Sequence, residues 1–197
     1  MIAIEFMTLD GVVQGPSSPD EDRSGRFEHG GWHAPHSRDE TFMRVLIAAI
    51  TGAGGFLLGR GTYEIFAAHW PNASSDEQVI AEPFSRKPKY VASTTLTAPL
   101  EWTGSTLLEG DVAETVAALK REDGGDLLAI GSPELVRTLL THNLVDELRL
   151  MIDPVVVGGG KRLFADDGVL RNLSLAESTV TTTGAIMCTY LPREGRA

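Results

Sequence analysis

Apolar runs alternate with segments of helical periodicity along most of the chain. Four runs of large or β-branched side chains predict strands at residues 2–7, 56–58, 89–93 and 127–130. Apolar residues at helical spacing predict helices near 42–50, 62–66, 112–119 and 135–140. The pattern then becomes β, with strands expected at 147–152, 173–179 and 185–191. This order favours an α/β fold with a mostly parallel central sheet, helices on both faces and an antiparallel C-terminal edge.

One long segment, residues 14–36, has little apolar periodicity and many Pro and Gly residues. Loops of this length in compact domains are usually functional or mobile. After it, Ser37 and Glu40 have the spacing of a capping box and predict the start of the next helix. Asp111 and Glu114 predict a second capping box before the helix at 112–119, which we expect to end at Gly124–Gly125.

Length and composition indicate an ordinary globular protein. The 197 residues, 42% of them hydrophobic, predict one domain spanning 1–197. A formal net charge of -10 disfavours a general nucleic-acid binder, because an acidic surface repels a phosphate backbone. No signal or membrane-spanning segment is visible in the sequence, and the single cysteine, Cys188, excludes an internal disulfide. We therefore expect a cytoplasmic protein without a membrane partner.

Polar and glycine residues follow three of the predicted strands. They occupy Gly59–Thr62, Ser93–Thr95 and Gly131–Glu134. In open α/β sheets, ligands collect beyond the carboxyl ends of the strands, where helix N-termini offer free N–H groups. A pyrophosphate bound between the first and third segments is one interpretation, with Arg60 meeting a further phosphate. The other is that these are ordinary strand-to-helix turns, since neither a GxGxxG nor a P-loop sequence is present.

The long loop holds three histidines close together, His29, His33 and His36. They raise the possibility of zinc, but the acidic partner of a helical HExxH motif is missing and we expect no metal. Trp32 in the same loop is suited either to stacking on a flat heterocycle or to covering the core. Cys188 is most simply a small buried hydrophobe.

Four ordered motifs resemble a known family. They are the segments 58–64 (LGRGTYE), 89–94 (KYVAST), 130–132 (IGS) and 154–164 (PVVVGGGKRLF). Together they resemble the dihydrofolate reductase-like superfamily, and more narrowly the reductase domain of the bifunctional riboflavin-biosynthesis deaminase-reductase and its stand-alone bacterial relatives. The resemblance extends to Asp10–Gly11 and to residues 30–32. It implies a three-layer sandwich over nearly the whole chain.

The resemblance also implies an NADPH site. Residues implied at the phosphates of the adenosine side are Gly59, Arg60 and Thr62, with Arg60 as the partner of the 2'-phosphate. Those implied along the adenosine are Ser93 and Thr94. The implied pyrophosphate contacts are Gly131, Ser132, Glu134 and Leu135, and the implied nicotinamide contacts are Val13 and Gly15. One departure is that Ser132 follows Gly131, where the family motif usually has two adjacent glycines.

The implied reaction is hydride transfer to a small heterocyclic or ribosylated metabolite, similar to reduction of 5-amino-6-(5-phosphoribosylamino)uracil in riboflavin biosynthesis. Candidate substrate contacts are Trp32, Gly159, Lys161 and Arg162, with Arg23 and Arg26 as further candidates for a substrate phosphate. The candidate proton donor is Asp39, because Glu40 has a structural role in the predicted capping box.

Two other functions stay open at this point. One is a dihydrofolate or pterin reductase, although the acidic residue that grips a pterin in dihydrofolate reductases is not assignable here. The other is a nucleotide-binding module without turnover. Relatives of this kind commonly form homodimers, and the apolar segment 185–191 is the candidate contact.

Overall fold

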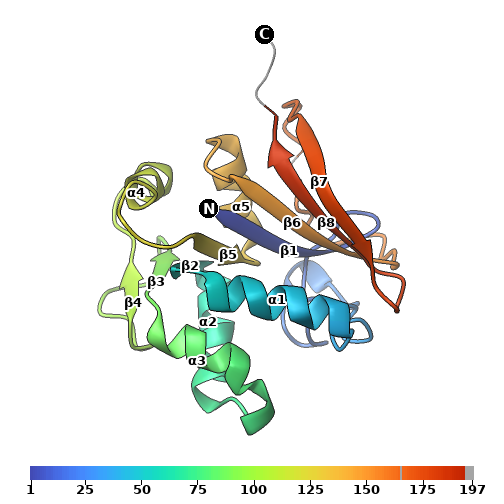
Figure 1. Ribbon diagram of the computed structural model, residues 1–197, viewed down its shortest axis with the longest axis horizontal. Helices are drawn as coiled ribbons and strands as arrows, with labels where there is room; N and C mark the ends of the chain where they lie inside the picture. Colours follow the sequence, from blue (N-terminus) through green and yellow to red (C-terminus); the bar gives the residue numbers. More distant parts are fainter. Residues whose placement is uncertain (165, 194–197) are drawn as a thin grey trace.

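The computed structural model describes residues 1–164 and 166–193, and its centre is one eight-stranded sheet (Figure 1). The strands are β1 (Ile2–Thr8), β2 (Gly55–Gly59), β3 (Lys89–Ala92), β4 (Ser105–Leu107), β5 (Leu127–Ile130), β6 (Glu147–Asp153), β7 (Leu173–Val180) and β8 (Ile186–Pro192). Their order across the sheet is β4-β3-β2-β5-β1-β6-β8-β7. The first six strands in this order pair in parallel, and the β6–β8 and β8–β7 pairs are antiparallel. The predicted fold class is confirmed.

Helices cover both faces of the sheet and make three layers (Figure 1). Their bounds are α1 (Glu40–Gly52), α2 (Arg60–His69), α3 (Gln78–Arg86), α4 (Val112–Leu119) and α5 (Pro133–Thr141). Strand β2 shows how the layers form, because successive side chains of a strand point to opposite faces. Phe56 and Leu58 pack in one core with α1, α2 and α3, whereas Leu57 packs in the other with α4 and α5. All three side chains are fully buried.

The start of α1 differs from the prediction. Asp39, rather than Ser37, caps the helix, and its Oδ1 accepts hydrogen bonds from the backbone N–H groups of Thr41 and Phe42 at 2.9 and 3.1 Å. The hydroxyl of Ser37 donates to the carbonyl oxygen of Ala34 instead, inside a run of turns that continues to residue 38. The predicted capping box is therefore wrong by two residues.

Other boundaries also differ. The predicted short strand at Val12–Val13 is a single bridge between Val12 and Arg162. Asp111 caps α4 as predicted, but the helix ends at Leu119, before the glycines expected to stop it. Strand β4 and helix α3 were not predicted. Among the described residues, no helix is both long enough and apolar enough to span a bilayer.

Candidate cofactor and substrate site

Two of the predicted turns meet through one side chain. Because β2 pairs with β5, the β2–α2 and β5–α5 turns lie next to each other at the carboxyl edge of the sheet. The Ser132 hydroxyl accepts a hydrogen bond from the Gly59 N–H at 2.8 Å and donates to Thr62 Oγ1 at 2.7 Å. Ser132 is 8% exposed. The hydroxyl therefore fixes the N-terminus of α2 against the turn that starts α5.

The backbone of the second turn explains its residues. Gly131 and Ser132 both have left-handed dihedrals, with φ of 63° and 64°. This conformation is strained for a residue with a Cβ, and such strain persists only where the surroundings support it. The two hydrogen bonds of the Ser132 hydroxyl provide that support. At the facing position, a Cβ on Gly59 would lie 3.1 Å from Ser132 Cβ and Oγ, so the close approach favours glycine there.

The paired turns bring two helix N-termini together. The first N–H groups of a helix have no acceptor within the helix and carry the positive end of its dipole. Arg60, the first residue of α2, adds a guanidinium whose side chain is 55% exposed and lies 3.9 Å from Glu64. On α5, Glu134 is exposed, whereas Leu135 is buried in the core and offers only its backbone. This arrangement is chemically suited to an anion. The N–H of Gly59 is taken by Ser132, so Gly59 contributes space rather than a donor.

The third predicted turn lies one strand further along the same edge, since β3 pairs with β2. The Ser93 hydroxyl accepts hydrogen bonds from the N–H groups of Thr95 and Leu96, at 3.1 and 3.0 Å, and so closes the turn. Thr94 is exposed. The order of the turns along the edge is thus Ser93, Gly59 and Gly131, which matches the order implied for a dinucleotide running from adenosine to pyrophosphate.

The predicted nicotinamide contacts follow β1, the other neighbour of β5. Val13 is buried, and its N–H donates to the carbonyl oxygen of Lys161 at 2.9 Å. Gly15 has φ of 56°, and its carbonyl oxygen accepts from the Gly31 N–H at 2.8 Å. Both residues are therefore held on the sheet by the glycine turn after β6 and by the end of the long loop.

An open cleft of about 520 Å³ lies beside these residues, between residues 24–29 and the turn 157–161. Gln14 joins its two walls, since its amide nitrogen donates to the carbonyl oxygens of Asp22 and Ser24 and its amide oxygen accepts from the Lys161 N–H. The Lys161 ammonium is 2.8 Å from the Asp22 carboxylate, and these contacts lower the pKa of Asp22 to about 2 despite its partial burial.

The predicted substrate contacts are not all in this cleft. Gly159 and Lys161 line it, as does Arg26. Trp32 is only 7% exposed, packs with Val12 and Phe27, and donates from Nε1 to the Gln14 carbonyl oxygen at 2.8 Å. It covers the core, the second of the two predicted uses.

The two remaining basic candidates lie outside the cleft lining and face acids. Arg162 is half exposed and lies 3.7 Å from Asp10. Arg23 is paired with Asp20 at 2.9 Å, and its Nε donates to the Pro19 carbonyl oxygen. Both guanidiniums would have to leave these partners to meet a substrate phosphate.

Asp39 is structurally occupied. While Oδ1 caps α1, Oδ2 accepts from the hydroxyl and the N–H of Thr182, at 2.5 and 2.9 Å, in the β7–β8 turn. The hydroxyl bond is the main reason why the pKa of Asp39 lies below its usual value. A carboxylate held ionised in this way is a poor proton donor. We therefore do not carry Asp39 forward in that role.

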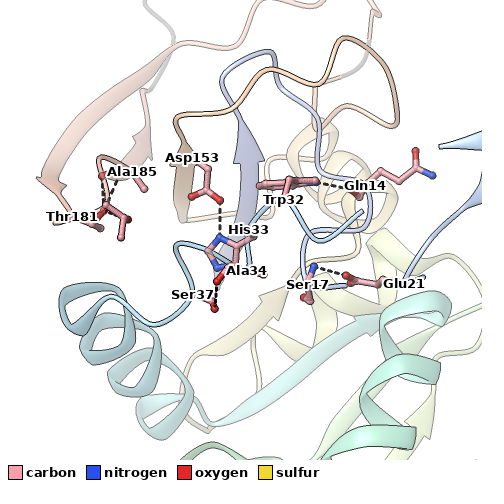
Figure 2. Close-up of polar contacts among 11 residues, drawn as sticks. Gln14, Ser17, Glu21, Trp32, His33, Ala34, Ser37, Asp153, Thr181 and Ala185 are labelled. Atoms are coloured by element: carbon pink, nitrogen blue, oxygen red, sulfur yellow. Dashed lines mark hydrogen bonds and ion pairs between the residues drawn. The ribbon is translucent and has the colours of Figure 1, made fainter. Parts of the chain in front are cut away.

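The histidines of the long loop separate in the structure. His33 Nδ1 lies 2.8 Å from Asp153 Oδ2 at the end of β6, with both side chains buried (Figure 2). His36 is buried, and His29 is exposed at the cleft. In the ranges that the structure describes, no three His, Cys, Asp or Glu side chains converge as a metal site would require. The sequence reasoning considered His33 only as a metal ligand and did not find its partner.

Comparison with known proteins identifies the family. A model described as the RibD C-terminal domain matches residues 1–187. The chain belongs to this family. A curated relative is the uncharacterized protein YyaP of Bacillus subtilis (strain 168), which is 32% identical over 137 residues, or 68% of this chain and 71% of YyaP.

Solved structures place this RibD C-terminal domain in the dihydrofolate reductase-like fold. A candidate riboflavin biosynthesis protein from Shewanella sp. PV-4 is 21% identical, with 98% of each chain covered and a TM-score of 0.70. Dihydrofolate reductase from Enterococcus faecalis, solved with NADP(H) and an inhibitor-like ligand named RAB-propyl, is 14% identical, with 98% and 96% of the chains covered and a TM-score of 0.61. At these identities the likeness shows the fold.

Proposed function

We propose that this RibD C-terminal domain is an NADPH-dependent reductase of a small heterocyclic or ribosylated metabolite. The observation that carries the proposal is the pair of helix N-termini joined by Ser132 at the carboxyl edge of β2 and β5. Family membership supports a reductase, and NADP(H) in the dihydrofolate reductase of the same fold supports the cofactor.

The residues present fit the cofactor in three respects. The N–H groups at the starts of α2 and α5 suit a pyrophosphate. The close approach at Gly59 leaves no side chain between the two turns, because a Cβ there would meet Ser132 at 3.1 Å. The exposed Arg60 would discriminate NADPH from NADH, because its planar guanidinium matches the 2'-phosphate and keeps its charge.

NADPH would supply a hydride at the nicotinamide C4, and the chain would supply position and a water-poor surface. Val13 and Gly15, fixed by backbone hydrogen bonds, would form the platform for the nicotinamide ring. The cleft beside Gln14 would accept the polar part of the substrate, with Gly159 and Lys161 in its wall. We infer that Arg26 faces the same substrate group.

The face between β1 and α1 argues against a folate. There, Phe6 packs against the His33 and Phe42 rings, with centroid distances of 4.7 and 5.7 Å. The apolar hollow between α1 and the β1–β6–β8 strands has a volume of about 40 Å³. Ligand pockets for small molecules are several times larger. A bound pterin would require these aromatic side chains to separate.

The test starts with binding. Tryptophan fluorescence is titrated with NADPH and with NADH, and we expect NADPH to bind at least tenfold more tightly. Oxidation of NADPH is then followed in the presence of 5-amino-6-(5-phosphoribosylamino)uracil, with dihydrofolate as the comparison substrate. Turnover of the first and not the second supports the proposal. Equal weak binding of both nucleotides contradicts it, whereas tight NADPH binding without turnover of either substrate would indicate a nucleotide-binding module.

A further inference from the structure

A buried His–Asp pair lies at the carboxyl end of β6, and neither the fold nor the cofactor site accounts for all of its atoms. His33 Nδ1 is 2.8 Å from Asp153 Oδ2, and the two side chains are 5% and 0% exposed. His33 Nε2 and Asp153 Oδ1 are both buried without a hydrogen-bond partner in the described part of the chain. Buried polar atoms are nearly always paired, so these two indicate a function or a missing ligand.

The neighbours of His33 fix its ring. It stacks on Phe6 of β1 with a centroid distance of 4.7 Å and an interplanar angle of 21°, and meets the edge of Phe42 of α1 at 5.1 Å. A carboxylate at Nδ1 favours the tautomer with the proton on that nitrogen, which leaves Nε2 as the atom that exchanges a proton with a ligand. Figure 2 shows Nδ1 directed at Asp153.

The pair lies next to the predicted nicotinamide platform. Thr8, at the end of β1, is the register partner of Asp153. The His33 N–H donates to the Pro16 carbonyl oxygen at 3.0 Å, and the Gly31 N–H donates to Gly15 at 2.8 Å. Two backbone hydrogen bonds thus connect the histidine segment directly to the platform.

We propose that His33 is the proton donor of the reduction and that Asp153 is the residue that positions it. The electrophilic carbon of a C=N or C=O group accepts the hydride from NADPH, and the π electrons move to its nitrogen or oxygen. That atom takes the proton from Nε2 of the imidazolium, which becomes neutral, and the oxidised nucleotide is NADP⁺. Solvent then returns a proton to Nε2.

This inference rests on the proposed function, and it requires a movement. Nε2 is enclosed in the present structure, so substrate reaches it only when residues 30–38, a run of turns, shift away from the ring. Besides Asp153 of β6, the titratable groups near His33 are His36 and Asp39 of its own segment, while β1 and α1 present the aromatic rings of Phe6 and Phe42. These groups must be considered when a pH profile is assigned.

The kinetic test uses His33→Asn, whose amide retains a donor toward Asp153 but has no group at the position of Nε2. The matched control is His69→Asn at the end of α2, where the His69 ring also lies 3.0 Å from a carboxylate, that of Glu77. With 5-amino-6-(5-phosphoribosylamino)uracil as substrate, we expect His33→Asn to lower kcat by about 10²- to 10⁴-fold and the control to leave it unchanged. The affinity for NADPH should change by less than about twofold in both variants.

The pH profile separates catalysis from a structural role. Wild-type kcat/KM should fall as pH rises and the imidazolium is lost, and this limb should disappear in His33→Asn. A variant that retains kcat within about threefold, with an unchanged profile, overturns the proposal and leaves the pair as an anchor of the loop.

A second measurement does not depend on turnover. The ring nitrogens of His33 and His69 are observed by NMR while NADP⁺ is added to the full chain. We expect the His33 signals to shift and the His69 signals to stay. Unchanged His33 signals in a chain saturated with NADP⁺, as judged by fluorescence, overturn this inference alone. A chain that does not bind NADP⁺ overturns the proposed function and this inference with it.

Discussion

The two halves of the sheet's carboxyl edge differ in how they are finished. At β2 and β5, two helices begin beside exposed polar side chains such as Arg60 and Glu134, and little of the chain covers them. At β1 and β6, the long loop folds back over the strands and buries Trp32 and His33. The first half is built for a charged ligand as it stands. The second is packed like a core and must rearrange to admit one.

The covered half nevertheless contains more unpaired buried polar atoms. Four of the six side-chain atoms without partners in the described chain belong to Glu5, His33, His36 and Asp153, which are all on or beside β1 and β6. The open half satisfies its buried Ser132 hydroxyl with two hydrogen bonds. The contrast indicates that nucleotide binding and substrate chemistry are divided between the two halves.

The largest expected effect concerns Glu5 in the covered half. It is 2% exposed, and burial raises its pKa from 4.5 to about 8, with Arg137 opposing the rise. Between these two pH values the folded chain binds more protons than the unfolded chain, so the free energy of unfolding should decrease as pH rises through this window. Glu5→Gln should abolish that decrease, which is on the order of 3–5 kcal/mol.

Urea unfolding of wild type and Glu5→Gln at several pH values between 4.5 and 8 measures this effect. The two proteins should differ most at the alkaline end, where the variant is the more stable. Parallel curves would mean that Glu5 is not held neutral and that water reaches this part of β1.

The second effect tests how tightly the glycine turn packs against the long loop. Gly160 has φ of 121°, and a Cβ there would lie 2.9 Å from side-chain atoms of Phe27 and Val12. Gly160→Ala should therefore lower the free energy of unfolding by about 2–4 kcal/mol through strain and overpacking. Gly159→Ala is the control, because no atom lies within 4 Å of its added Cβ. Equal stabilities would show that the loop yields easily.

In the open half, Arg60→Ala should affect binding and not folding. Loss of a charge-assisted contact with the 2'-phosphate should weaken NADPH binding by about 1–3 kcal/mol and leave NADH binding unchanged. Arg86→Ala on α3, an arginine that also pairs with a glutamate of its own helix, serves as the control. Isothermal titration with both nucleotides measures the difference, and an unaltered preference for NADPH would remove Arg60 from the site.

The smallest effect is expected at the link between the turns. Ser132→Ala removes both hydrogen bonds of the hydroxyl and should lower the free energy of unfolding by about 1 kcal/mol. Thr62→Val removes only one of them and should cost less. Thermal unfolding of the two variants ranks them, and the reverse order would contradict the role given to Ser132.

The open half was largely predictable from sequence because its signals are local. A buried apolar run such as Leu127–Ile130, followed at once by Gly131, Ser132 and a proline, marks a strand, a turn and a helix within a few residues. Parallel pairing then brings the ends of such strands to one edge. The hydroxyl link from Ser132 to Gly59 was not predictable, since it joins residues 73 positions apart.

The covered half was less predictable because its contacts are distant in sequence. His33 and Asp153 are separated by 120 positions, and no spacing rule connects them. Asp39 was assigned to chemistry because Ser37 matched a capping box, yet the turns that run through residue 38 delay the helix and give the cap to Asp39. Strand β4 has three residues and no buried apolar pattern, so nothing in its sequence indicated a strand.

The most direct test of the account is a map of the bound nucleotide on the backbone. NADP⁺ is titrated into the ¹⁵N-labelled chain, and amide shifts are followed residue by residue. We predict saturable shifts centred on residues 60–62 and 134–135, the two helix starts, with smaller ones at Val13 and Gly15. Shifts confined to the cleft of residues 24–29 and 157–161, or none at all, would contradict a dinucleotide site between the turns.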